Sequence, residues 1–207
     1  MGCHALSRDG TKIAMTLAGA FGRGAIFNVA DRVPTNDFTV PTPTSWDFAT
    51  FDSKATKLLT VENGHMMLRD LTGALLLPNE VPNLVGPLAT HPEISPDDTH
   101  LVNVEFTGGA DYSASGGTIV TRTFDTTTNT FGAPAVLVPI TASSESNFYP
   151  SYSPDGQWIV FTRTSGQSYN DGSAQTWVVK ADGSQPPVQL TTANFGGGLT
   201  NSWARWV

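Results

Sequence analysis

Charged residues are scarce in this chain of 207 residues, and so are stretches without Gly or Pro that are long enough for a helix. Charged residues make up 14% of the sequence, whereas roughly a quarter is usual in globular domains. Gly (20) and Pro (14) interrupt most stretches long enough for a helix, and no window keeps a helical apolar period. This composition excludes a helical bundle and indicates many short strands joined by turns.

Other absences narrow the class of protein. One cysteine excludes an internal disulfide framework. No apolar run reaches the roughly 18 residues of a membrane-spanning helix, and the start, MGCHALSRDG, has neither a signal-peptide core nor the myristoylation pattern. A net charge of −7 with scattered Lys and Arg argues against nucleic-acid binding. The Thr/Ser/Gly-rich, lysine-poor composition favours a periplasmic or extracellular (bacterial envelope) location.

One short pattern recurs along the chain. The stretch YPSYSPDGQWIVFTR at 149–163 has relatives that start at Cys3, Ser45 and His91. Alignment on their acidic turn residues, Asp9, Asp52, Asp97 and Asp155, gives intervals of 43, 45 and 58 residues. A fifth start, NSWARWV, occupies 201–207.

Each repeat predicts the same antiparallel meander. A short strand leads to an Asp-Gly turn whose residues need positive φ angles. An alternating second strand, a third strand and a short fourth strand follow. The third strands are expected at 25–29, 66–71 and 118–124, and the last unit closes at 188–190.

A four-stranded unit of this size cannot bury both of its faces, so neighbouring units must stack. Radial stacking predicts a β-propeller, and a two-sheet sandwich is the competing interpretation. We expect a single all-β propeller segment with about four blades and the inner strand of a fifth. The expected bounds are 3–41, 45–82, 90–140 and 148–193, with the partial blade at 201–207.

The repeated residues resemble the TolB-type propeller repeat, which has a proline, an aromatic residue and Ser-Pro-Asp-Gly before an apolar strand. The match is closest in the last unit and poor in the second unit, FATFDSKATK, which we expect to carry a two-residue insertion. The resemblance implies a scaffold fold rather than one activity. No segment here matches the separate α/β domain of the family's namesake. We expect a part or half of a larger propeller, with apolar end faces covered by self-association or by further propeller segments.

Catalytic and cofactor patterns are weak. The chain has no G-x-S-x-G elbow, and its four histidines have simple structural interpretations, so we expect no enzyme activity. No metal-binding pattern is complete, although calcium in the central channel or between loops stays an open alternative. Cys3 and His4 form the downstream half of C-x-x-C-H, which makes them candidates for covalent haem c attachment. A buried cysteine is the favoured interpretation of Cys3.

Long polar loops between the strands are the best candidates for ligand binding. Within them we select Tyr112 and Tyr169 as stacking faces, and Glu145, Asn147 and Asp171 as hydrogen-bonding groups. The expected function is a non-catalytic scaffold that binds a protein or peptide through its rim loops or channel. The alternatives are a carbohydrate-binding, lectin-like propeller and the propeller part of a larger enzyme or c-type cytochrome.

Overall fold

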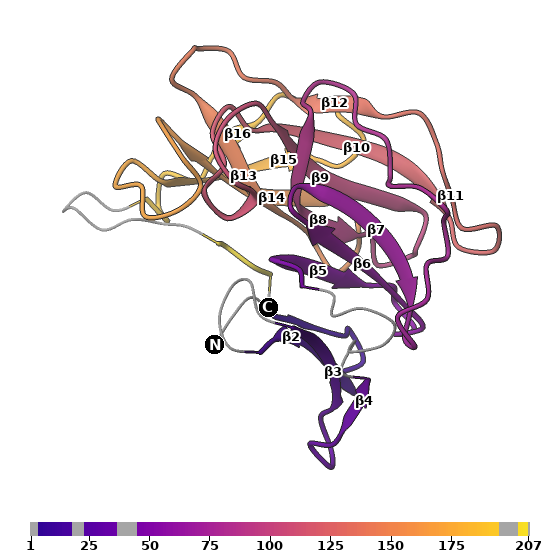
Figure 1. Ribbon diagram of the computed structural model, residues 1–207. Helices are drawn as coiled ribbons and strands as arrows, with labels where there is room; N and C mark the ends of the chain where they lie inside the picture. Colours follow the sequence, from indigo (N-terminus) through magenta and orange to yellow (C-terminus); the bar gives the residue numbers. More distant parts are fainter. Residues whose placement is uncertain (1–3, 18–22, 37–44, 195–202, 207) are drawn as a thin grey trace.

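Four antiparallel sheets follow one another along the chain and fan out around a common centre (Figure 1). The computed structural model describes residues 4–17, 23–36, 45–194 and 203–206. Within these ranges the only helical element is the 3-10 turn η1 (Asp111–Ser113). The chain is therefore an all-β propeller segment, as the repeats predicted.

Each sheet is a blade that begins with its innermost strand. The strands of the first blade are β1 (His4–Leu6), β2 (Lys12–Thr16), β3 (Gly24–Asn28) and β4 (Pro34–Asn36). Those of the second are β5 (Phe48–Phe51), β6 (Lys57–Glu62) and β7 (His65–Asp70). Those of the third are β8 (Leu88–Ile94), β9 (His100–Phe106), β10 (Thr118–Asp125), β11 (Thr130–Phe131) and β12 (Ala135–Val138). Those of the fourth are β13 (Ser146–Tyr152), β14 (Trp158–Thr164), β15 (Gln175–Lys180) and β16 (Val188–Gln189).

Two blades depart from the regular four-stranded form at their outer edge. In the second blade, residues 74–81 replace a regular fourth strand, because the backbone N–H of Leu76 donates to Leu68 and that of Val81 to Met66. In the third blade the fourth position is divided, since β11 pairs with the end of β10 and β12 with its beginning.

The repeated turns align differently from the sequence prediction. In three turns a serine, Ser7, Ser95 or Ser153, accepts a 2.9 Å hydrogen bond from the N–H five residues ahead. Asp52 accepts the same bond from Lys57 (2.8 Å), so it matches these serines and not Asp9, Asp97 and Asp155. The predicted two-residue insertion was therefore wrong. The intervals become 45, 43 and 58 residues, and a carboxylate replaces a hydroxyl in the second turn.

In this corrected alignment, the residue with a positive φ lies at the same position in all four turns. Gly10 and Gly156 have φ of 71° and 72°, and Ala55 and Asp98 have 50° and 60° in the other two turns. Aspartate tolerates this conformation better than most residues. Here its carboxylate also accepts hydrogen bonds from the N–H (2.7 Å) and hydroxyl (2.6 Å) of Ser53, which joins the second and third turns.

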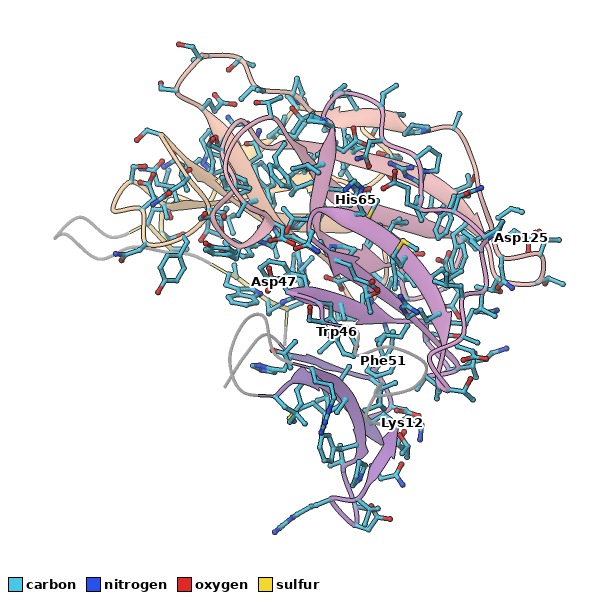
Figure 2. The ribbon with its side chains drawn as sticks, viewed as in Figure 1. Lys12, Trp46, Asp47, Phe51, His65 and Asp125 are labelled. Atoms are coloured by element: carbon cyan, nitrogen blue, oxygen red, sulfur yellow. The ribbon has the colours of Figure 1, made fainter. Side chains whose placement is uncertain are left out.

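Two apolar clusters hold the blades together. The larger cluster joins the second, third and fourth blades and includes Leu59, Val104 and Phe161. The smaller one joins the first and second blades through Trp46 and Phe51, which Figure 2 shows between β5 and the first sheet. Inter-blade contact is thus the source of the core, since each sheet alone is one layer thick.

A buried ion pair fixes the chain between the second and third blades. Arg122 Nη2 lies 3.0 Å from Glu105 Oε1, and both side chains have no exposed surface. Glu105 Oε2 also accepts hydrogen bonds from the backbone N–H groups of Leu84 (2.7 Å) and Val85 (2.6 Å). These bonds satisfy the buried carboxylate, which would otherwise be costly to bury.

The outward faces of the first and last blades are apolar and outside both clusters. On the first blade, Leu6, Ile13 and Phe27 lie side by side on the face opposite Ala14 and Ile26. On the last blade, Val178 pairs with the half-exposed Val188 beside Val160. In the interior of the fan the corresponding faces are covered by the next blade.

Replacing Gly156 by valine is expected to destabilise the fold by more than about 1 kcal/mol, because a β-branched side chain resists positive φ. Space is not the reason, since a Cβ at this position would have only Pro96 Cδ within 4 Å, at 3.7 Å. Chemical denaturation measures the change in the free energy of unfolding. Gly172→Val is the matched control, because no atom lies within 4 Å of its added Cβ and its φ is not positive. Equal effects of the two substitutions would contradict the strain argument.

We expect the apolar end faces to make the chain self-associate or close a ring with further propeller segments. Light scattering should then report a mass above that of one chain. Ile13→Lys and Val188→Lys place a charge on either face and should lower that mass. A monodisperse single chain that both substitutions leave unchanged would count against the prediction.

Candidate functional site

A cavity of about 640 Å³ lies at the centre of the fan. Its walls come from the first strand of every blade and from the segment 203–206. Aromatic and apolar walls come from Leu6, Phe51, Tyr152 and Trp206, and polar groups from Arg8, Glu93 and Arg205. We call this cavity the axial pocket.

Glu93 lies at the middle of the axial pocket and binds two arginines from distant parts of the chain. Its Oε1 is 3.1 Å from Arg8 Nη2 in the first turn, and its Oε2 is 2.7 Å from Arg205 Nη1. Arg8 Nη2 also donates to the carbonyl of Ile94 (3.0 Å), and Arg205 Nη1 to Ser151 Oγ (3.2 Å). The first blade, the third blade and the segment 203–206 are thereby linked across the centre.

The charges of this cluster are unequally exposed. Burial raises the pKa of Glu93, and the guanidinium groups of Arg205 and Arg8 act in the opposite direction. The Glu93 side chain is 11% exposed, whereas those of Arg8 and Arg205 are 33% and 54% exposed. The positive groups thus face the solvent side of the pocket.

An aromatic cluster closes the centre next to the pocket. His91 lies 4.3 Å from Phe48 and 4.0 Å from Tyr149, measured between ring centroids. Tyr149 in turn stacks on Trp203 at 5.0 Å. Burial, and then the charge of Arg205, hold the pKa of His91 well below its ordinary value. His91 therefore packs as a neutral ring, which agrees with its structural interpretation from the sequence.

Three members of this cluster share a strained backbone conformation. His91, Tyr149 and Trp203 have φ of 49°, 52° and 62°, which non-glycine residues seldom adopt. In β8 and β13 the strand register shifts at this point. Trp203 thus shares the conformation of its counterparts in β8 and β13, although residues 203–206 do not form a regular strand. Residues 201, 202 and 207 of the predicted partial blade lie outside the described residues.

A second buried group lies at the beginning of β5. The side chain of Asp47 is hydrogen-bonded to Asp111 of η1, and burial, with that bond and the neighbouring charge, raises the pKa of Asp47 to about 8. Asp111 also accepts a 3.0 Å bond from the N–H of Gly64. The environment thus favours the protonated form of Asp47, which joins the second blade to a loop of the third.

Two of the predicted ligand-binding residues contact the protein itself. Asn147 is fully buried, and its Oδ1 accepts a 2.8 Å bond from Arg163 Nε. Glu145 lies 3.2 Å from Arg163 Nη2. The guanidinium of Arg163 lies over the ring of Trp177 at 4.4 Å. These two residues thus hold Arg163 in the fourth blade.

The other three predicted ligand-binding residues lie on two adjoining loops. Ser115 bridges Gln167, so the loop carrying Tyr112 lies beside the loop carrying Tyr169 and Asp171. The tyrosines are 38% and 64% exposed. Asp171 accepts hydrogen bonds from the N–H and hydroxyl of Ser173 within its own loop.

The structure describes only part of the predicted haem-attachment pair. Cys3 lies outside the described residues, and His4 is exposed at the edge of the axial pocket, where it begins β1. Among the described residues no group of three or more His, Cys, Asp or Glu side chains could hold a metal ion. The same part of the chain has no helix that is long and apolar enough to cross a membrane.

Arg8, Glu93 and Arg205 were not predicted from the sequence to form one site. The turn alignment contained a signal, because Arg8 replaces the proline found in the third and fourth turns. The fifth start contained another, because Arg205 stands where the last repeat has Ser151.

No family model matches the sequence, and no curated protein does. Solved structures share its fold at low identity. TolB from Acinetobacter baumannii is 16% identical with a TM-score of 0.60, over 88% of this chain and 41% of that one. A structure from Agrobacterium tumefaciens named as a TolB is 18% identical with a TM-score of 0.56, over 91% and 61%. A chain of a nidogen/laminin complex is 9% identical with a TM-score of 0.59, over 88% and 62%.

These similarities support a β-propeller fold of the kind found in TolB. The chain spans less than two thirds of the length of each of these structures. Identities this low concern the fold alone.

Stability should depend on pH through Asp47. Because its pKa is raised in the folded state, the free energy of unfolding should fall as pH rises from the unfolded value near 4 to about 8. Asp47→Asn should remove this fall, so the free energy of unfolding of the variant, relative to that of the natural chain, should increase with pH. Urea denaturation between pH 5 and 8 measures the slope.

Asp125→Asn is the control for this measurement. Hydrogen bonds from the backbone N–H groups of Thr127 and Thr128 lower the pKa of Asp125, so its contribution is lost only at more acidic pH. Equal slopes for Asp47→Asn and the natural chain would contradict the assignment.

Proposed function

We propose that this protein is a non-catalytic β-propeller scaffold that binds a protein or peptide in its axial pocket. The proposal includes a TolB-type origin of the repeats and a location in the bacterial envelope or outside the cell. The propeller fold and the lysine-poor composition support these two parts.

The axial pocket is the observation that carries the proposal. Its volume of about 640 Å³ can hold several side chains. It combines exposed arginine with exposed tryptophan, two residue types enriched at protein-binding sites. The rigid first strands of four blades form its walls, so little ordering is needed when a partner binds.

Carbohydrate binding is a second candidate function. The exposed rings of Tyr112 and Tyr169 on adjoining loops favour it, because aromatic faces stack on sugar rings. The candidate uses a different surface from the axial pocket, so substitutions can separate the two.

Selection of a random linear peptide library against the whole chain tests the first proposal. Peptides should be enriched whose binding falls at least tenfold on Leu6→Trp, which fills the pocket from an exposed position. Tyr169→Ala lies outside the pocket, and Ile13→Trp lies next to Leu6 on the outward face of the first blade but also outside the pocket. Both are controls and should leave binding unchanged. Absence of any pocket-dependent peptide would overturn the proposal, and a glycan array signal lost on Tyr169→Ala would support the carbohydrate candidate in its place.

A further inference from the structure

We propose that the axial pocket selects acidic peptide segments, with a carboxylate bound by Arg205 and Arg8 and a neighbouring apolar side chain packed on Trp206. This inference rests on the proposed function and names its ligand class.

The first reason is electrostatic. The chain carries a net charge of −7, yet the cluster of Arg8, Glu93 and Arg205 has one positive charge in excess. At close range the two guanidinium groups attract an anionic group and repel a cationic one. The net negative charge of the whole chain acts in the opposite direction at long range, where salt screens it.

The second reason is the number of donors that the two arginines present. A guanidinium has five N–H donors in a planar fork. Among the described residues, the hydrogen bonds of Arg205 run through Nη1 and those of Arg8 through Nη2. The remaining N–H groups of two partly exposed side chains can bind a carboxylate in the bidentate geometry that arginine favours.

Glu93 is a positioning residue in this arrangement. It is nearly buried, while each of its oxygens holds one guanidinium. Held in this way, both arginines lose less side-chain freedom when a ligand binds, which strengthens binding.

The third reason is the apolar surface beside the arginines. Trp206 is 40% exposed, and its Nε1 donates to the carbonyl of Ser151 (3.0 Å), which fixes the ring at the pocket wall. Leu6 is 60% exposed on the same pocket. Exposed apolar groups of this size next to a charged site suit a ligand with an apolar side chain adjacent to its carboxylate.

The backbone favours a peptide over an acidic sugar. The innermost strands β1, β5, β8 and β13 are the end strands of their sheets. Their inner edges therefore carry backbone N–H and C=O groups that no neighbouring strand of the same sheet pairs. An extended peptide can hydrogen-bond to such an edge while its side chains enter the pocket.

The peptide library selection described above, followed by binding measurements on synthetic peptides, tests the ligand class. Enriched peptides should contain Asp or Glu next to an apolar residue. Replacing that acid by its amide should weaken binding at least tenfold, as should Arg205→Gln. Arg205→Lys should recover part of the loss because it keeps the charge but not the fork. Higher salt should weaken binding to the natural chain and have less effect on Arg205→Gln.

Arg32→Gln is the matched control, since Arg32 is an exposed arginine on the β3–β4 turn, outside the axial pocket. It changes the net charge equally and should leave affinity unchanged. Equal losses of affinity from Arg32→Gln and Arg205→Gln would show that the effect comes from the net charge of the chain, and would contradict the proposed site. Thermal melting of each variant shows that it is folded, and Arg8→Gln supplies an independent arginine variant if Arg205→Gln is not.

The remaining outcomes separate the inference from the proposed function. Enriched peptides that lose binding on Leu6→Trp but contain no acid, or that keep full affinity for Arg205→Gln, overturn the inference and leave the proposed function. Preferential binding of uronic-acid oligosaccharides at this pocket overturns the peptide assignment. Absence of any pocket-dependent ligand overturns both.

Discussion

The described sheets have apolar side chains on both faces, and inside the fan the neighbouring sheets cover these faces. Leu59, Val104 and Phe161 belong to one cluster that joins three blades. Burial of apolar surface contributes about 25 cal/mol per Å², so these inter-blade faces supply most of the favourable energy. Radial stacking also brings the first strand of each blade to one place. The axial pocket is thus a consequence of how the core is formed.

The strained residues at the centre connect this packing to the site. Positive φ at His91 and Tyr149 costs on the order of 1–3 kcal/mol per residue, and such strain persists only where surrounding contacts require it. Here the contacts are the stacked rings of the aromatic cluster. The register shift in β8 lies between Thr90 and Glu93, directly before the carboxylate that binds both arginines. A bulge changes which way the next side chains point. The placement of Glu93 therefore depends on the strained step before it.

Local chemistry explains which features the sequence could predict. Turns and alternating strands are determined over a few residues, so the repeats were enough to predict the propeller. The predicted alignment was wrong at Asp52 because a carboxylate can replace serine in accepting the Lys57 N–H, so Asp52 was matched to the acidic residues of the other turns. The site was harder to predict because Arg8, Glu93 and Arg205 meet only after four blades have stacked. Loop polarity alone selected Asn147, which packs inside the protein.

Two ion-pair systems in the same protein show how a structural arrangement differs from one suited to binding. Arg122 and Glu105 are paired one to one with no exposed surface, and backbone N–H groups occupy the second carboxylate oxygen. Burial there is complete and the charges balance, so the pair can only support the fold. At the axis one buried carboxylate holds two arginines that remain partly exposed. The cluster therefore keeps one positive charge in excess, and its exposed part faces the open side of the pocket. The same interaction, placed at the centre of the fan instead of between two sheets, thus leaves two guanidinium groups partly exposed, and the proposed binding site depends on them.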